Sequence, residues 1–416
     1  MSQRTTPRLY YGYVIVFLSL LVAAVAWGSQ RTFGVFLDPL IQVYHWSRAA
    51  TSLTITIQSL VTGSMAILAG RLSDRFGPRI VLMICGILIG AGFVLSSFVS
   101  NLWQLYLLQG ILVGAGLAGI MVPLMSMVIR WFTYRAGLMN GLVSSGQGLG
   151  TMIVPPVAAV LITQYQWQRA YEIIGIAALI LIVGFTQFLK RHPETTETPS
   201  TGNTKPPIAI PGVKSVTFRE SLKTRTFWLL GVLYFIDVFN VNVFMVHIVI
   251  HVKAVLLTNG GDALIAATAA TTVLSAAAAV SILGRVGAGF LTDRLGIRWT
   301  IGIGLGVVAL AFVWVLFCTS LWMFYLFAAV FGLGGWCVGA VMSPLVAEYF
   351  GLHEHGSIFG AVTFIGVAGG AFGALIAGAI YDKMQSYNPA FILCSVLSVA
   401  GLIMLQFLRK PEVKTT

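Results

Sequence analysis

The chain has 416 residues, of which 57% are hydrophobic and only 9% are charged. A soluble domain of this length does not have such a composition, so we expect a protein of the lipid bilayer. The formal net charge of +12 would suit a nucleic-acid partner. The cations, however, lie between apolar runs in a pattern that membrane topology explains, and we expect no such partner.

Twelve apolar runs, each long enough for a bilayer-spanning helix, follow one another along the chain. The first has no small-residue cleavage site behind it, so we expect a retained span and not a signal peptide. The predicted fold class is all-α, a polytopic membrane protein with twelve transmembrane helices. The spans are expected at 13–37, 49–70, 79–99, 103–130, 137–163, 171–190, 226–251, 264–291, 299–318, 321–349, 357–382 and 389–408.

The charges predict an orientation. Twelve spans place both termini on one side of the membrane, and 19 of the 25 Lys and Arg residues fall on that side. Arg285 lies inside a span. The five on the opposite side are Arg31, Arg48, Arg169, Lys253 and Lys383. The positive-inside rule therefore predicts a multi-pass protein of the plasma (cytoplasmic or inner) membrane with both termini in the cytoplasm.

One long segment interrupts the series of spans. Residues 191–225 are rich in Pro, Thr and Lys and cannot bury a core, so we expect a flexible cytoplasmic linker. Its end, 218–228, is expected to form a short amphipathic helix on the membrane surface. The predicted parts are a six-helix bundle over 1–190, the linker, and a second six-helix bundle over 226–416.

The two predicted bundles repeat each other. Gly70–Arg79 reads Gly-Arg-Leu-Ser-Asp-Arg-Phe-Gly-Pro-Arg and shares six residues, at an offset of 219, with Gly289–Arg298. Weaker matches pair 131–141 with 349–360, Pro123 with Pro344, and 170–171 with 390–391. Parallel repeats of this kind build transporters whose substrate site lies near the midplane between the halves. We therefore predict two pseudo-symmetric halves.

The loop Gly70–Arg79 resembles the signature loop of the major facilitator superfamily, and the resemblance covers nearly the whole chain. Two pairs of stretches are similar to the first-span pattern and the fifth-span entry of the monocarboxylate transporter family. They are Tyr11–Val16 with Arg31–Phe36, and Trp131–Gly141 with Gly146–Gly150. The bacterial oxalate:formate antiporters are similar too. They share an arginine eight residues before the loop aspartate, which corresponds here to Arg285 and Asp293.

Three positions depart from these families. Ser281 stands where the monocarboxylate transporters often have an Asp, and Arg31 stands where they often have a Lys. The oxalate exchangers carry a Lys in the span that corresponds to 357–382, and the residues from Ser357 to Tyr381 have none.

Arg285 is the residue that points most directly to a substrate. A charge at membrane depth costs at least ~2.5 kcal/mol, so such a residue is a functional-site hypothesis by default. A guanidinium binds a carboxylate bidentately and stays charged at any working pH. The equivalent residue of the first half is Ala66, so the fold does not require the charge. The alternative is a structural arginine that bonds the backbone carbonyls of a neighbouring helix.

A polar face on the span 226–251 predicts proton coupling. Asp237, Asn240, Phe244, His247 and His251 recur at steps of three and four, which places them on one side of a helix. A salt bridge from Asp237 to the arginine is geometrically possible, and the carboxylate takes up a proton more easily when substrate claims its partner. We predict Asp237 and His247 as proton-coupling residues. The alternatives are a permanent ion pair and histidines that lie among lipid headgroups.

The two loop motifs are expected to act as gates, because their aspartates can cap a neighbouring helix end or pair with Arg135. The predicted gating residues are Gly70, Asp74, Arg75, Gly77, Arg79, Arg135, Gly289, Asp293, Arg294, Gly296 and Arg298. The predicted substrate-binding residues are Arg285, Ser281, Met121, Gln147, Trp336 and Asn240. The four cysteines have no CxxC spacing and no phosphate-binding loop motif occurs, so we expect no metal, no cofactor and no enzyme.

These observations predict a secondary active transporter of small monocarboxylates such as lactate or pyruvate. Proton-coupled symport by alternating access, carried out by a monomer in the bilayer, is the expected mechanism. With Arg285 as the one cation at mid-membrane depth, dicarboxylates should bind less well, because their second charge would lack a partner. The alternatives are an organic-anion antiporter of the oxalate:formate type and a transporter-like sensor that binds a ligand without moving it.

Overall fold

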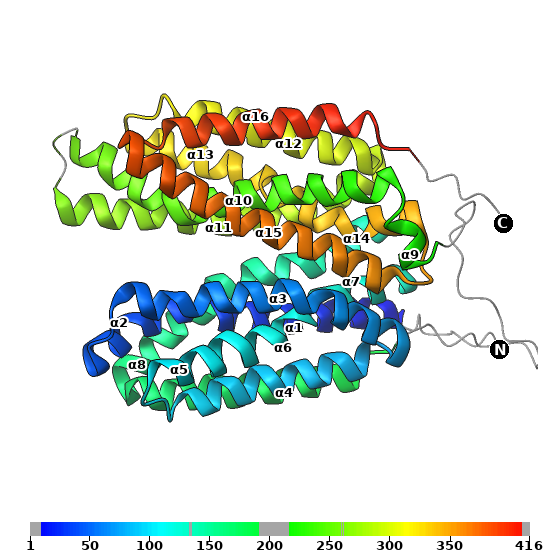
Figure 1. The fold of residues 1–416 in the computed structure, drawn as a ribbon, viewed down its shortest axis with the longest axis horizontal. Coiled ribbons are helices and arrows are strands. Elements are labelled where there is room, and N and C mark those ends of the chain that lie inside the picture. The colour runs from blue at the N-terminus through cyan, green and yellow to red at the C-terminus, as the bar shows by residue number, and fades with distance from the viewer. Residues whose placement is uncertain (1–9, 133–134, 191–215, 259, 261, 410–416) are drawn as a thin grey trace, which may run out of the picture.

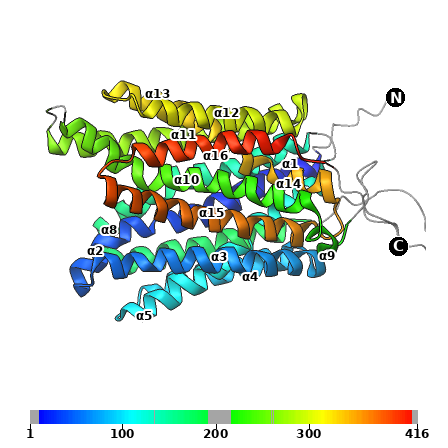
Figure 2. The ribbon, with the colours of Figure 1, turned by 45° about the horizontal axis from the view of Figure 1, so that its top comes forward.

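The computed structural model describes residues 10–132, 135–190, 216–258, 260 and 262–409. Its helices run side by side along one long axis (Figures 1 and 2), and no strand occurs among the described residues. Helix α1 begins and α16 ends at the end of the bundle that carries α9, here called the α9 end. The opposite end, which carries α2, is called the α2 end.

The predicted all-α membrane fold is confirmed. Eleven helical stretches of the described residues are long and apolar enough to cross a membrane. The longest of them, Ala136–Gln187, consists of two helices that meet at Gln166, where φ is 68° and ψ is 162°. Counting this stretch as two gives the twelve spans that the sequence predicts.

The helices of the first half are α1 (Tyr11–Arg31), α2 (Phe33–Tyr44), α3 (Arg48–Phe76), α4 (Pro78–Ser96), α5 (Leu102–Leu105), the π-helix η1 (Tyr106–Leu112), α6 (Val113–Ala118), α7 (Met121–Trp131) and α8 (Ala136–Gln187). Those that follow the first half are α9 (Phe218–Ser221), α10 (Arg225–Thr258), α11 (Ala263–Leu295), α12 (Ile297–Val315), α13 (Leu321–Gly334), α14 (Cys337–Phe350), α15 (His355–Met384) and α16 (Asn388–Leu405). Three predicted spans are thus divided between helices: one at Thr32, between α1 and α2, one between α6 and α7, and one between α13 and α14.

The segment between the halves differs from its prediction. Residues 191–215 lie outside the described residues, and the expected helix over 218–228 is a single turn, α9, because α10 already begins at Arg225. The N–H of Val216 donates to the Phe350 carbonyl (3.1 Å), and that of Phe218 donates to the Glu354 carboxylate (2.6 Å). These two bonds attach the turn to the connection between α14 and α15.

A capping box closes this turn. The Thr217 hydroxyl accepts from the N–H of Glu220, whose carboxylate accepts in return from the N–H of Thr217 (2.8 Å). The hydrogen bonds from the Thr217 N–H and hydroxyl lower the pKa of Glu220, which favours the charged form at this helix N-terminus.

The recurrent loop glycines have a backbone reason. Gly77 and Gly296 have φ of 92° and 89°, values that L-residues with a side chain rarely adopt. Each ends one long helix, α3 or α11, and the next helix begins at the following residue. The motif therefore builds the same tight corner in both halves.

Glycines also bring the two halves together. Helix α8 packs on α11, and α3 packs on α15. A methyl group on Gly141 would lie 2.4 Å from the Arg285 carbonyl oxygen, and one on Gly360 would lie 2.5 Å from the Ala66 carbonyl oxygen. The two contacts are equivalent, so Arg285 and Ala66 occupy matching places in the two halves, as the 219-residue offset predicts.

Candidate functional site

Arg285 is buried where α11 meets α8. Its side chain is 4% exposed, and its Nη1 donates to the Ser281 hydroxyl one turn earlier on the same helix (2.7 Å). The guanidinium carbon stands 5.1 Å from the centre of the Trp336 ring. A methyl group on Gly148 would lie 3.1 Å from Nη1, so α8 of the first half approaches the charge closely. The structure thus brings Arg285, Ser281 and Trp336 together at the boundary between the halves.

Asp237 is buried on α10, with 5% of the residue exposed. Its carboxylate faces Gly339, in the first turn of α14, where a methyl group on that glycine would lie 3.6 Å from Oδ2, and it interacts electrostatically with Arg285. The ion pairs within 4.0 Å among the described residues do not include one between Asp237 and Arg285. The direct salt bridge considered from the sequence is therefore not formed.

A second cation acts on the same region. Arg31 is the last residue of α1, and α1 and α2 form one continuous membrane-spanning stretch, Tyr11–Tyr44. Its side chain is exposed, yet its charge interacts with that of Arg285. A second cation therefore influences Arg285, and the prediction that Arg285 is the one cation at mid-membrane depth stays a prediction. Sequence reasoning counted Arg31 with the outer charges, because span boundaries cannot show which side chains face one another.

The other polar residues of α10 turn away from Arg285. Asn240 donates to the Ser398 hydroxyl of α16 (2.8 Å), and His247 bonds the Ala374 carbonyl of α15 (3.0 Å) and the Tyr387 hydroxyl (3.2 Å). These residues share a helix face, as predicted, but this face packs inside the second half. The structure does not bring Asn240 to the arginine.

Two further predicted substrate residues belong to the first half. Met121 is the first residue of α7, after the break in that span, and it packs against the apolar cores of both halves. Gln147 is half-buried on α8, directly before the glycine that faces Arg285. Their roles in binding stay predictions.

The loop aspartates join the halves at the α9 end. The Asp74 carboxylate accepts from the N–H groups of Gly356 (3.1 Å) and Ser357 (2.8 Å), at the start of α15. The Asp293 carboxylate accepts in the same way from Gly137 and Leu138, at the start of α8, both at 2.9 Å. Each aspartate of one half therefore caps a helix of the other, which is the first of the two arrangements considered from the sequence.

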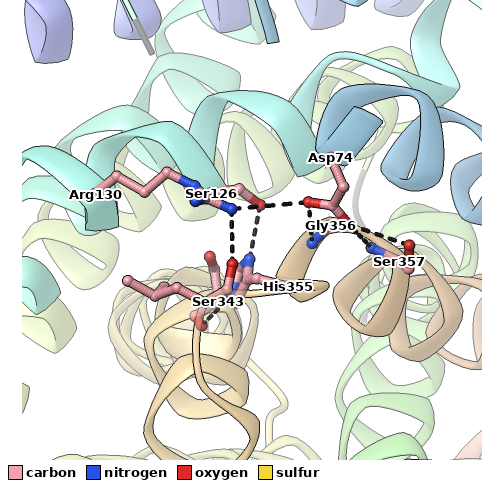
Figure 3. Close-up of polar contacts among 8 residues, drawn as sticks. Asp74, Ser126, Arg130, Ser343, His355, Gly356 and Ser357 are labelled. Atoms are coloured by element: carbon pink, nitrogen blue, oxygen red, sulfur yellow. Dashed lines mark hydrogen bonds and ion pairs between the residues drawn. The ribbon is translucent and has the colours of Figure 1, made fainter. Parts of the chain in front are cut away.

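The Asp74 contact is part of a larger buried network (Figure 3). The Arg130 guanidinium lies 3.8 Å from the Asp74 carboxylate and donates to the Leu352 carbonyl at 2.8 Å. His355 bonds the Ser126 hydroxyl through Nδ1 (2.8 Å) and the Ser343 carbonyl through Nε2 (3.0 Å). We call these contacts, with those of Asp74, the Asp74 seam. The contacts of Asp293 with the start of α8 are the Asp293 seam.

The remaining motif residues have separate places. Gly70 and Gly289 permit close backbone contact with Gly356 and Gly137 of the opposite half. Arg135 is the left-handed residue (φ 65°) before α8. The arginines at the helix ends contact neighbouring side chains and one backbone carbonyl. Arg75 stands over Phe76, Arg294 over Phe290, Arg79 donates to Gln187 (2.5 Å), and Arg298 donates to the Tyr349 hydroxyl and the Leu408 carbonyl.

The model of the family described as Major Facilitator Superfamily matches residues 16–256 and 227–416. The chain belongs to this superfamily. It is 27% identical over 411 residues to monocarboxylate transporter 13 of Rattus norvegicus, with 96% of this chain and 90% of that protein covered. It is 25% identical to monocarboxylate transporter 12 of Homo sapiens (96% and 80% covered). It is 28% identical to the uncharacterized MFS-type transporter YhjX of Escherichia coli (84% and 83% covered).

The fold agrees with this membership. The fucose:proton symporter FucP of Escherichia coli, a solved structure, superimposes with a TM-score of 0.70 at 14% sequence identity, covering 96% of this chain and 100% of that one. The relatives that the chain matches are membrane transporters and not enzymes.

Three side chains of the Asp74 seam, those of Ser126, Arg130 and His355, were not predicted from the sequence. Arg130 and Ser126 lie one turn apart on α7, and His355 precedes the glycine that Asp74 caps. The i, i+4 spacing of Ser126 and Arg130 places both on one helix face, which was the available signal. Arg130 is the last residue of the predicted span 103–130, and the structure places it inside α7, 7% exposed.

Proposed function

We propose that this protein is a secondary active transporter of small monocarboxylates of the lactate and pyruvate type, driven by proton symport through alternating access. The observation that carries the proposal is the buried Arg285 guanidinium at the boundary of the halves. Among the described residues no carboxylate lies within 4.0 Å of it. A substrate carboxylate is the partner that such a group lacks, and relatives named monocarboxylate transporters support this choice.

The charges of the site support coupling to a proton. Arg31 and Arg285 with an ionised Asp237 leave one net positive charge. When a monocarboxylate binds and Asp237 takes up a proton, the net charge of the site is unchanged. The loaded and empty forms then meet the same electrostatic cost when the halves reorient, whereas an anion alone would alter that cost.

The proposed location is the plasma or inner membrane, with the α9 end in the cytoplasm. The cations of the loop motifs and of α9 gather at this end, in agreement with the positive-inside rule. Each half buries an apolar core of its own, and the site is built from one chain, so we propose a functional monomer.

The test is uptake into proteoliposomes of the purified protein. Radiolabelled lactate and pyruvate should accumulate when the outside is made acidic, and should exchange with internal substrate when no pH gradient is imposed. Failure of every short monocarboxylate in both assays would contradict the proposed function. A rate of substrate exchange that does not change when a pH gradient is imposed, without accumulation, would favour an antiporter.

A specific observation keeps the antiporter as a second candidate. Two arginines act on one region, and two cations suit a dicarboxylate such as oxalate. We expect Arg31→Gln to weaken competition by oxalate or malonate about fivefold, the effect of about 1 kcal/mol for an accessible cation, while lactate is changed less. Competition against labelled lactate at fixed pH measures this. If oxalate outcompetes lactate on the wild type and loses this advantage in the variant, the antiporter replaces the symporter.

The seams at the α9 end are proposed to hold this end closed, because the bonds of Asp74, Asp293, Ser126 and Arg130 to the residues at the starts of α8 and α15 and to Leu352 cross between the halves. Asp74→Asn removes a charged acceptor of three hydrogen bonds, and each bond to a charged group contributes about 1.5–3 kcal/mol. We expect a cysteine placed at Val122, which is buried beside the second half, to be alkylated at least about tenfold faster in this variant.

Asp293→Asn is the matched control for this prediction. Asp293 caps its helix with two bonds of similar length, but the Asp74 seam adds Arg130, Ser126 and His355. A smaller increase in the alkylation rate is therefore expected. Equal rates in wild type and Asp74→Asn would show that the Asp74 seam does not control this end.

A further inference from the structure

The break between α13 and α14 lies between the two charges of the proposed coupling mechanism. Helix α13 ends at Gly334 and α14 begins at Cys337, with Trp336 as its N-cap residue. Gly339, in the first turn of α14, faces the Asp237 carboxylate. A methyl group on Gly339 would lie 3.6 Å from Asp237 Oδ2, so carboxylate and helix start are in contact.

On its other side the same helix start contacts the arginine. The Trp336 ring lies against the Arg285 guanidinium, and the guanidinium carbon is 5.1 Å from the ring centre. Two phenylalanines hold the indole edge-on, with ring centres 5.6 Å away for Phe331 and 6.2 Å for Phe244. The start of α14 thus contacts Asp237 through Gly339 and Arg285 through Trp336.

We propose, on the basis of the proton-coupled transport proposed above, that Trp336 is the positioning residue that links the protonation of Asp237 to the availability of Arg285 for substrate. An ionised carboxylate at a helix N-terminus is favoured by the helix dipole and by the N–H groups of the first turn. In this state α14 is held in place, and Trp336 engages the guanidinium through a cation–π contact. Protonation removes the charge that the helix N-terminus attracts and frees the first turn of α14. The ring then leaves Arg285, which becomes able to bind a carboxylate.

The surroundings of Asp237 are compatible with this role. The charged or titratable groups that interact electrostatically with it are Tyr234 on its own helix, Arg285 on α11 and Cys337 on α14. Only Arg285 among these carries a charge when Asp237 titrates, and the start of α14 contacts both residues. Proton and substrate therefore meet at this helix start, and no direct salt bridge is required.

The first test uses exchange of radiolabelled lactate in proteoliposomes at an acidic and an alkaline pH. In the wild type the KM should be higher at alkaline pH, where Asp237 is ionised and Trp336 holds Arg285. Trp336→Leu removes the cation–π contact and should reduce the ratio of the two KM values about tenfold, mainly by lowering the alkaline value. Trp336→Phe keeps an aromatic face, so it should reduce the ratio of the two KM values less than Trp336→Leu does.

Ser281→Ala is the matched control. Ser281 also holds Arg285, but from the same helix and without contact to α14, so its loss should shift both KM values alike and leave their ratio unchanged. A Trp336→Leu protein that exchanges lactate with the wild-type ratio would overturn the inference.

A second test does not depend on the cargo. Asparagine is isosteric with a protonated aspartate. At one fixed pH, Asp237→Asn should therefore raise the rate of amide hydrogen exchange in the first turn of α14 relative to that in α13. Unchanged exchange there would overturn the inference even if lactate is transported. Faster exchange in a protein that moves no carboxylate would support the link and contradict the proposed function, so the two failures are distinguishable.

Discussion

Arg285→Ala should abolish carboxylate transport while the protein still inserts and purifies. Removing one partner of a buried, hydrogen-bonded charge pair costs about 2–5 kcal/mol, so uptake should fall by about a hundredfold or more. Arg285→Lys should also show little uptake, since an ammonium lacks the planar guanidinium group that binds a carboxylate at two points. Initial rates of labelled lactate and pyruvate uptake measure the effect, with detergent-solubilised monodispersity as the check on folding.

The structure supplies a reason why the variant should fold. Ala66 occupies the equivalent place in α3 and makes the same glycine contact, so an alanine fits this part of the fold. Lys253→Ala, which removes an exposed cation from α10, is the control and should retain uptake. Full uptake by the Arg285→Ala protein would remove this residue from substrate binding and leave it a structural role.

Much of the architecture could be predicted because each feature depends on local chemistry. Apolar length determines the spans, and the repeated Gly-Asp-Gly pattern determines the corners at Gly77 and Gly296, where a positive φ is needed. The interruptions could not be predicted in the same way. At Gln166 a non-glycine residue adopts a positive φ, and between α13 and α14 the helix breaks inside an apolar run. Packing of neighbouring helices decides such positions.

The candidate site was predictable in its members more than in its contacts. Helical spacing places Asp237, Asn240 and His247 on one face of α10, but it cannot show which helix this face meets. The structure directs Asn240 and His247 to α15 and α16, and only Asp237 toward α14. Arg31 shows the same limit, since its approach to Arg285 joins α1 and α11, which are far apart in the chain.

Asp237→Asn should abolish proton-driven accumulation and retain substrate exchange. Asparagine cannot take up a proton, so an imposed pH gradient has no group at this position on which to act. The amide is of similar size and stays in contact with the start of α14, and Arg285 stays charged and able to bind a carboxylate. In proteoliposomes with an acidic exterior, labelled lactate should equilibrate without rising above the external concentration, while counterflow continues.

The control is Asp382→Asn, which removes an exposed carboxylate near the end of α15 and should accumulate lactate as the wild type does. Normal accumulation by the Asp237 variant would exclude this residue as the proton carrier. His247 could then be tested by His247→Gln, because it is buried on the same face of α10 as Asp237. Loss of exchange together with accumulation, in a variant that remains folded, would assign Asp237 to the structure of the α14 start. A carboxylate needed there only as a helix cap must stay ionised throughout the cycle, and the proton would then travel by another group.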